Sequence, residues 1–136
     1  MMTKVFISYR ADNEGTQYKK LLVAWSLNPH RNFFDFKFED QSIGTSINST
    51  DAYYIKSRIK DKIDSSDKII CLVGENTSTS DWVNWELEYA HSLGKPIAAI
   101  KIKNSYKTPI NLYGVNATWA KSFTFDSIKK AIDDAN

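Results

Sequence analysis

The stretch KIICLVGENTSTSDWVNWELEYAHSLGKPIAAIKIK, residues 68–103, decides the fold class. Residues 68–74 form the most continuous apolar run in the chain. Their β-branched content predicts a central strand that is buried on both faces, as in a parallel sheet. A polar segment, residues 75–80, leads into an amphipathic helix, and residues 95–103 predict the next strand. Strand, helix and strand in this order predict two parallel strands joined by a crossover helix.

The same alternation extends over the rest of the chain. Apolar patterning predicts further strands at 4–8 and 32–38 and helices at 17–28, 52–66 and 126–136, the first capped near Thr16 and the last by Asp126. Residues 115–125 fit either a short helix or a fifth strand. The sequence therefore predicts a doubly wound α/β sandwich with about five parallel strands in one domain, residues 1–136.

In such folds ligands bind beyond the carboxyl ends of the strands, where the strand order reverses. In the flavodoxin-like order this point lies between the first and third strands. The loops expected to line it are SYRADN, residues 8–13, and GENTSTS, residues 74–80. The second loop leads directly into the predicted helix that starts near residue 81.

Composition excludes several classes of function. A chain of 136 residues with a net charge of +2 does not favour nucleic acid or anionic lipid as a partner. Its single cysteine, Cys71, excludes an internal disulfide and lies in a predicted core strand. His30 and His91 are isolated, which argues against a metal site. Without a leader-like N-terminus or an apolar stretch of ~20 residues, we expect a cytoplasmic protein that does not contact membranes.

Two glutamates in the helix near residue 81 have different surroundings. At ~100° per residue, a helical wheel groups on one face Trp82, Val83, Glu86, Tyr89, Ala90 and Leu93. The opposite face carries Asn84, Glu88, His91 and Ser92. We therefore expect Glu88 to face solvent and Glu86 to lie on the buried side. A buried carboxylate needs a hydrogen-bond partner, an ion pair or a cavity, because unpaired burial of charge is very unfavourable.

The residues alone leave two interpretations of Glu86 open. A structural Glu86 would accept hydrogen bonds from a loop, gain from the positive end of its helix, or pair with Arg10. A functional Glu86 would stabilise a cationic or oxocarbenium-like centre, since it lies near the predicted ligand crevice. Arg10 is equally open, either as a phosphate ligand or as a strut. Neither a P-loop nor a dinucleotide-binding glycine fingerprint is present.

Two motifs carry a family resemblance. VFISYR, residues 5–10, and SSDKIICLVGENTSTSDWVNWELEYAHSLGKPI, residues 65–97, resemble TIR-like domains, in particular those of the bacterial Thoeris anti-phage system, also described as MTH538-like. The resemblance covers roughly residues 3–125. It implies a flavodoxin-like three-layer α/β sandwich with a central parallel sheet.

The resemblance also implies an activity. Enzymatic members use NAD as their substrate and cleave its N-glycosidic bond. The reaction needs no metal and no other cofactor. Thoeris members convert the remaining ADP-ribose into a cyclic or conjugated signal that activates a separate effector protein. The family's catalytic glutamate maps onto Glu86, in a W-x-x-x-E setting with Trp82. Ser8, Tyr9 and Arg10 would help to form the nucleotide pocket, and homo-oligomers are expected.

One segment departs from the family pattern. Many TIR domains carry an R-D-x-x-P-G-like turn after the second strand, whereas this chain has FEDQSIGTSINSTD, residues 38–51. Asp40 is a candidate for a pocket role there. Because the fold alone does not decide catalysis, two alternatives remain: a non-catalytic module that assembles with other chains, and a deoxyribosyltransferase-like enzyme. The lack of a second convincing carboxylate does not count against NAD cleavage, because nicotinamide is a cationic leaving group.

Overall fold

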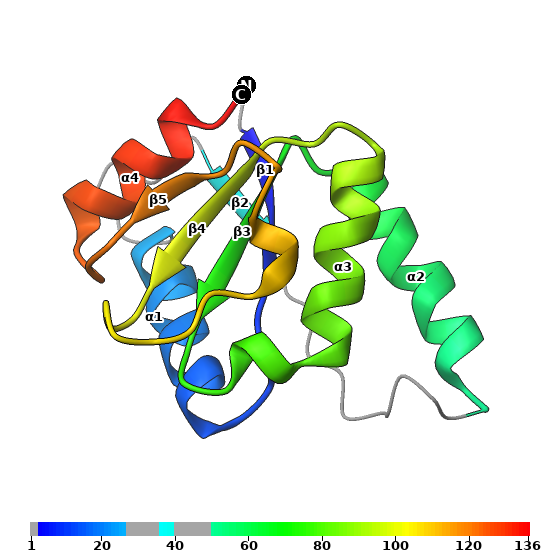
Figure 1. Cartoon of the computed structure of the whole chain (residues 1–136). Coiled ribbons are helices and arrows are strands. Elements are labelled where there is room, and N and C mark those ends of the chain that lie inside the picture. Colours follow the sequence, from blue (N-terminus) through cyan, green and yellow to red (C-terminus); the bar gives the residue numbers. More distant parts are fainter. Residues whose placement is uncertain (1–2, 27–35, 40–49) are drawn as a thin grey trace.

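A central parallel sheet with helices on both faces forms the fold (Figure 1). The computed structural model describes residues 3–26, 36–39 and 50–136. Its strands are β1 (Thr3–Ser8), β2 (Phe36–Glu39), β3 (Lys68–Val73), β4 (Ile97–Lys101) and β5 (Thr118–Ala120). Its α-helices are α1 (Asn13–Ser26), α2 (Ala52–Asp64), α3 (Asp81–Ser92) and α4 (Phe125–Asp134). Two short 3₁₀ helices are η1 (Thr77–Thr79) and η2 (Ile110–Leu112).

The strand order is β2-β1-β3-β4-β5. This order is the flavodoxin-like one, so the predicted doubly wound sandwich with about five strands is confirmed. The order reverses between β1 and β3, where Ser8 pairs with Cys71 in the register. The carboxyl ends of these two central strands therefore open onto the loops that lead into α1 and α3.

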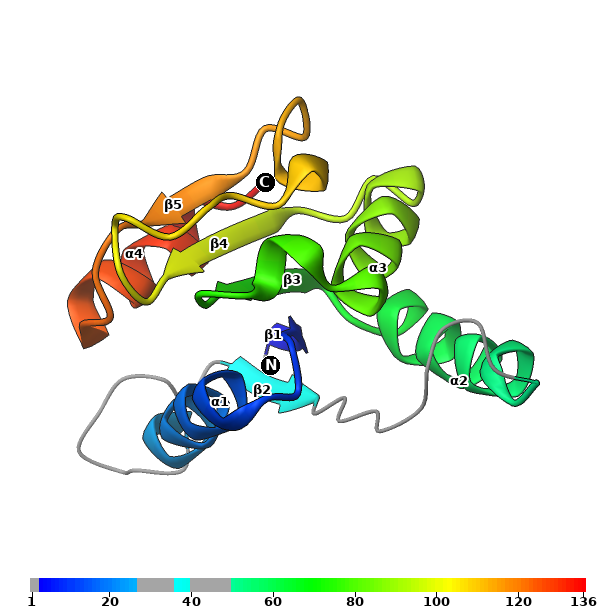
Figure 2. The ribbon, with the colours of Figure 1, turned by 60° about the horizontal axis from the view of Figure 1, so that its bottom comes forward.

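Each face of the sheet has its own hydrophobic core. Helices α1 and α4 cover one face, and α2 and α3 cover the other (Figure 2). Strand β3 contributes to both, because successive side chains of a strand point to opposite faces. Ile70 and Leu72 belong to the α1/α4 core, whereas Ile69, Cys71 and Val73 belong to the α2/α3 core. The prediction of a central strand buried on both faces is confirmed.

Two helices start at residues other than those predicted. Helix α1 begins at Asn13 rather than residue 17, because the Asp12 carboxylate accepts a hydrogen bond from the Gly15 backbone N–H at 2.8 Å. Thr16 therefore lies inside the helix. Helix α4 is capped by Thr124, not by Asp126, which instead lies in the first turn, where a negative charge is favourable.

The segment left open between a helix and a strand, residues 115–125, contains strand β5. Residues 27–28 of the predicted helix at 17–28 and residues 32–35 of the predicted strand at 32–38 lie outside the described residues. In the described part of the chain, no helix combines the length and the apolar character that crossing a bilayer requires.

Gly15 allows the first turn of α1 to approach the loop after β1. A Cβ atom at this position would lie 2.0 Å from the backbone oxygen of Arg10. We expect Gly15→Ala to lower the free energy of unfolding by about 1–3 kcal/mol, since backbone must shift to relieve the overlap. Urea denaturation measures this loss. Gln17→Ala, on the exposed side of the same helix, is the control, and equal midpoints for the two variants would contradict the prediction.

Candidate functional site

Ser8 and Glu86 meet at the point where the strand order reverses. Ser8 is the last residue of β1, and Glu86 lies in the second turn of α3. The Ser8 Oγ donates a hydrogen bond to Glu86 Oε1 at 2.7 Å. Helix α3 is held in this position from its first turn, where the Ser80 hydroxyl caps it by accepting from the Val83 N–H at 3.2 Å. The Ser8–Glu86 hydrogen bond links α3 to the carboxyl end of β1.

Both partners are buried. Ser8 is 0% exposed and Glu86 is 3% exposed. The prediction that separates Glu86 from Glu88 is confirmed, since Glu88 is exposed. Of the structural roles considered for Glu86, a hydrogen bond is the one observed, and its donor is the strand residue Ser8.

Arg10 occupies the strut position that the sequence left open. Its Nη1 donates to the Asn76 carbonyl oxygen at 3.2 Å and to Thr79 Oγ1 at 3.1 Å. Its Nε lies 3.7 Å from a carboxylate oxygen of Asp12. These contacts join the loop after β1 to the loop that leads into α3. Arg10 thus anchors the segment that immediately precedes α3.

A second carboxylate, Glu14 in the first turn of α1, is hydrogen-bonded to two loops at the same edge of the sheet. It accepts hydrogen bonds from the Glu75 backbone N–H at 2.9 Å and from the Tyr106 hydroxyl at 2.7 Å. A Cβ at Gly74 would lie 2.8 Å from its Oε1, so the glycine lets Glu14 approach. The hydrogen bond to Glu14 raises the pKa of Tyr106 to about 12. The sequence pattern does not reveal this link, because it predicts that the helix begins only at residue 17, after Glu14.

The buried site shifts the pKa of the Glu86 carboxyl group well above its ordinary value. Desolvation by burial raises the pKa of Glu86 to about 8, and the hydrogen bond from Ser8 opposes that shift. Burial, and to a smaller extent the charge of Glu86, raises the pKa of the Cys71 thiol on the neighbouring strand. The thiol is therefore neutral near pH 7, while Glu86 changes charge within reach of that pH. Such a group suits chemistry in which a carboxylate must stabilise developing positive charge in a site with little water.

The buried face of α3 differs from the wheel in its orientation. The buried residues of this helix are Val83, Glu86, Leu87 and Ala90. Leu87, which the wheel did not include, is 0% exposed, whereas Leu93 is 43% exposed. Leu93 is the C-cap residue and so lies beyond the last helical turn.

Trp82 starts an aromatic ladder on the flank of α3. Its ring meets Trp85 edge to face at 5.9 Å, and Trp85 stacks on Tyr89 at 5.9 Å with an interplanar angle of 8°. The ammonium groups of Lys56 and Lys60 lie over Trp85 and Tyr89, at 5.5 and 5.4 Å from the ring centres. Trp82 packs against the α2/α3 core at the edge of the helix, on the same side of the sheet as Glu86.

Tyr9 is buried on the other side of the sheet. Its side chain, 5% exposed, belongs to the α1/α4 core together with Leu22, and the Lys19 Nζ lies 5.8 Å from its ring centre. Adjacent residues at the end of a strand point to opposite faces, so Tyr9 and Ser8 diverge. The structure brings Ser8 and Glu86 together and places Arg10 in the adjoining loops, but it puts the Tyr9 ring behind the sheet.

Asp40 lies outside the described residues. Among the residues that the structure describes, no three His, Cys, Asp or Glu side chains are grouped closely enough to hold a metal ion.

Comparison with protein families gives one clear match. A family model described as "Thoeris protein ThsB, TIR-like domain" matches residues 6–107. This range includes the second half of β1, the whole of α3 and both partners of the Ser8–Glu86 hydrogen bond. Comparison with curated proteins found no match.

Several solved structures share the fold at low sequence identity. The chain is similar to the CMP N-glycosidase BcmB of Clostridium botulinum, with a TM-score of 0.63, 12% identity, and coverage of 96% of this chain and 99% of that chain. It is similar to a 2-deoxyribosyltransferase of Bacillus psychrosaccharolyticus, with a TM-score of 0.64, 13% identity, and coverage of 93% and 96%. The TIR domains of the activated Roq1 resistosome match with a TM-score of 0.50, 16% identity, and coverage of 73% and 57%.

Proposed function

Because the chain belongs to the family of TIR-like domains of the Thoeris protein ThsB, we propose that it cleaves the nicotinamide N-glycosidic bond of NAD, with Glu86 as the catalytic carboxylate. The observation that carries this proposal is the buried Ser8–Glu86 pair at the point where the strand order reverses. In this proposal the ADP-ribose product is released as a cyclic or conjugated signal that activates a separate effector protein of anti-phage defence.

The residues fit the chemistry of this reaction. The bond between the anomeric carbon of the ribose and the pyridinium nitrogen breaks, and its electron pair leaves with nicotinamide, which becomes neutral. The ribose then carries an oxocarbenium-like positive charge, which the deprotonated Glu86 stabilises. A water molecule, or a hydroxyl or ring nitrogen of the product itself, then attacks the anomeric carbon. Where the attacking group is water or a hydroxyl, its proton passes to the Glu86 carboxylate. No general acid is needed for the departure of nicotinamide.

Ser8 acts as a positioning residue. Its hydroxyl fixes one oxygen of Glu86 and favours the charged form of the carboxylate, so that the second oxygen remains for the ribose. The edge of the sheet is held by Arg10 and Glu14, which tie the surrounding loops together. A site held from several elements in this way keeps its geometry while the substrate binds.

Structural neighbours support the reaction class. The names of two of them, a CMP N-glycosidase and a 2-deoxyribosyltransferase, refer to chemistry at the bond between a sugar and a base. Their similarity to this chain extends over nearly the whole chain, although their sequences have diverged widely. The same fold therefore supports attack at an anomeric carbon, and NAD cleavage belongs to that class.

The direct test is incubation of the purified protein with NAD, followed by chromatography of released nicotinamide. CMP and a deoxyribonucleoside are offered in parallel, each with base release as the readout. The proposal is supported if nicotinamide is released from NAD faster than the base is released from CMP or from the deoxyribonucleoside. The assay is run without and with a phage lysate, because the enzyme can require a trigger. Faster release of a base from the deoxyribonucleoside would instead establish the deoxyribosyltransferase-like alternative.

A second candidate function is a non-catalytic assembly module. The observation that favours it is the exposure of two aromatic rings on α2, with Tyr53 87% exposed and Tyr54 64% exposed. This candidate predicts oligomers whose population grows with protein concentration and that persist in Glu86→Gln. Sedimentation velocity detects them, and the absence of base release from any substrate would complete the case.

Ser8→Ala is expected to move the pH dependence of catalysis. In the wild type, kcat/KM should rise with pH and level off above about 8, the pKa to which burial raises Glu86. Loss of the Ser8 hydrogen bond removes a contact that favours the charged form, so the rise should move to higher pH. At pH 7 we expect activity lower by roughly two- to tenfold. Ser92→Ala, on the exposed side of α3, is the control, and superimposable profiles for Ser8→Ala and wild type would refute the positioning role.

A further inference from the structure

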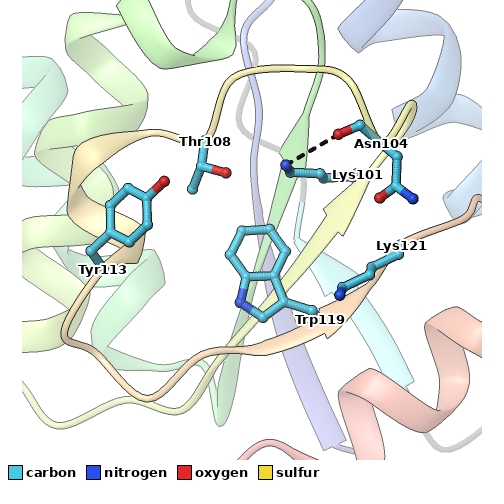
Figure 3. Close-up of a pocket in the computed structure, with 6 residues that line it drawn as sticks. All are labelled: Lys101, Asn104, Thr108, Tyr113, Trp119 and Lys121. Carbon is cyan, nitrogen blue, oxygen red and sulfur yellow. Dashed lines mark hydrogen bonds between the residues drawn. The ribbon is translucent and has the colours of Figure 1, made fainter.

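A separate pocket lies at the carboxyl ends of β4 and β5 (Figure 3). It has a volume of about 360 Å³ and is lined by Lys101, Asn104, Thr108, Tyr113, Trp119 and Lys121. Neither Ser8 nor Glu86 contributes to it. Its volume falls in the range of small-ligand pockets, roughly 300–1,000 Å³. We propose that this pocket is a second ligand site, which binds a nucleotide through its phosphates and its base.

The charge of the pocket fits phosphates. Among the described residues that line it, Lys101 and Lys121 are the only Lys, Arg, Asp or Glu side chains. The Lys101 Nζ contacts two uncharged groups, the Asn104 carbonyl oxygen at 3.4 Å and the Trp119 ring, whose centre lies 5.7 Å away. In the described part of the chain, neither lysine forms an ion pair with an acid. Two cations without a local counter-ion favour a ligand with negative charge.

The aromatic side chains fit a base. Figure 3 shows Trp119 in the middle of the six residues, with Lys101 and Lys121 on one side and Tyr113 on the other. Trp119 is partly buried against the α2/α3 core, and Tyr113 is 66% exposed. An indole fixed in this way offers a flat surface on which a base stacks, while the lysines beside it reach the phosphates. A bare phosphate would leave this aromatic side of the pocket unused.

The walls of the pocket are anchored to the rest of the fold. Lys101 and Trp119 belong to strands of the sheet. The connection between them is held at Tyr106, which donates to Glu14, and at Asn111, whose Nδ2 donates to the Asn84 carbonyl oxygen at 3.0 Å. Thr108 and Tyr113 come from the same connection. The pocket is therefore formed in advance rather than assembled by the ligand, which lowers the entropy lost on binding.

The test uses the full chain with Glu86→Gln as the parent protein, titrated with ADP in a calorimeter. We expect saturable binding to one site at this pocket. Lys101→Met/Lys121→Met should weaken it at least tenfold, whereas Lys103→Met/Lys107→Met, which removes the same charge from neighbouring positions, should change it less than about twofold, since nearby charges in solvent are largely screened. Adenosine should bind at least tenfold more weakly than ADP.

Tryptophan fluorescence locates the ligand. ADP should change the tryptophan emission of the parent protein. Trp119→Phe should remove that change while the midpoint temperature of thermal unfolding stays close to that of the parent. Unchanged ADP affinity in Lys101→Met/Lys121→Met, a fluorescence change that persists in Trp119→Phe, or no binding at millimolar ADP would each overturn the proposal. Because the parent carries Glu86→Gln, these results are independent of whether the protein cleaves NAD.

Discussion

Glu86→Gln is expected to reduce nicotinamide release by roughly 10²- to 10³-fold, since removal of a single preorganised electrostatic group from an active site has effects of this size. Glutamine has nearly the same shape as glutamate and keeps an oxygen that accepts the Ser8 hydrogen bond. It cannot carry the negative charge that stabilises the oxocarbenium-like state. Release of nicotinamide is followed by chromatography, and near-ultraviolet circular dichroism shows that the core packing is retained.

Glu88→Gln is the matched control for this experiment. It makes the same chemical change two residues away on the same helix, but Glu88 is exposed. We expect its activity to stay within about twofold of wild type, because surface substitutions away from special features have small effects. If both variants release nicotinamide at the wild-type rate, Glu86 is not the catalytic carboxylate.

The second large effect concerns stability and pH. Burial raises the pKa of Glu86 from 4.5 to about 8. Between these values the unfolded chain loses the Glu86 proton while the folded protein keeps it, so the unfolded state binds fewer protons and stability falls as pH rises. The contribution of protonated Glu86 is fully present below pH 4.5 and lost by about pH 8. The full loss is on the order of a few kcal/mol, given 1.36 kcal/mol for each pH unit.

Glu86→Gln removes this dependence. We expect the variant to be more stable than wild type at pH 8, with a difference that shrinks towards pH 5. Guanidinium denaturation at pH 5, 6, 7 and 8 measures the difference, in which the effects of all other titrating groups cancel. Glu88→Gln should run parallel to wild type. A constant difference between Glu86→Gln and wild type across this range would mean that Glu86 keeps an ordinary pKa in the folded protein.

The two predictions have one cause. A carboxylate that is solvated weakly is available to stabilise a cation, and the same weak solvation makes its charged form unfavourable in the empty site. Substitution should therefore raise stability and remove activity together, as expected where an active site carries strain for the sake of function.

Local pattern was sufficient for the central features of the fold. The apolar run at 68–74 identified β3 and its burial on both faces, because a short β-branched run of this kind is typical of a strand covered by two layers. The helical wheel separated Glu86 from Glu88, because the two positions differ by about 200° around the helix. The family resemblance then connected Glu86 with a reaction, which the residue pattern alone left open.

Other features depended on information that local patterns do not hold. Tyr9 was grouped with Ser8 as a pocket residue, although the two-residue period of a strand already indicated opposite faces. Glu14 lies in the first turn of α1, which forms because Asp12 caps the helix. The sequence pattern predicts the start of this helix only at residue 17, so it does not indicate that turn. Its bond to Tyr106 joins positions 92 residues apart, and no periodicity predicts which distant residues meet.

The Ser8–Glu86 hydrogen bond also has a consequence for protein synthesis. The two residues are separated by 78 positions, and they come from the first strand and the third α-helix of the fold. During translation, Ser8 leaves the ribosome long before Glu86 does, and β3 must insert beside β1 before the two can meet. The Ser8–Glu86 pair therefore forms only after α3 has been synthesised and has packed over β1. Under the proposed function, a nascent or truncated chain that has not yet placed α3 over β1 has no site at which to cleave NAD.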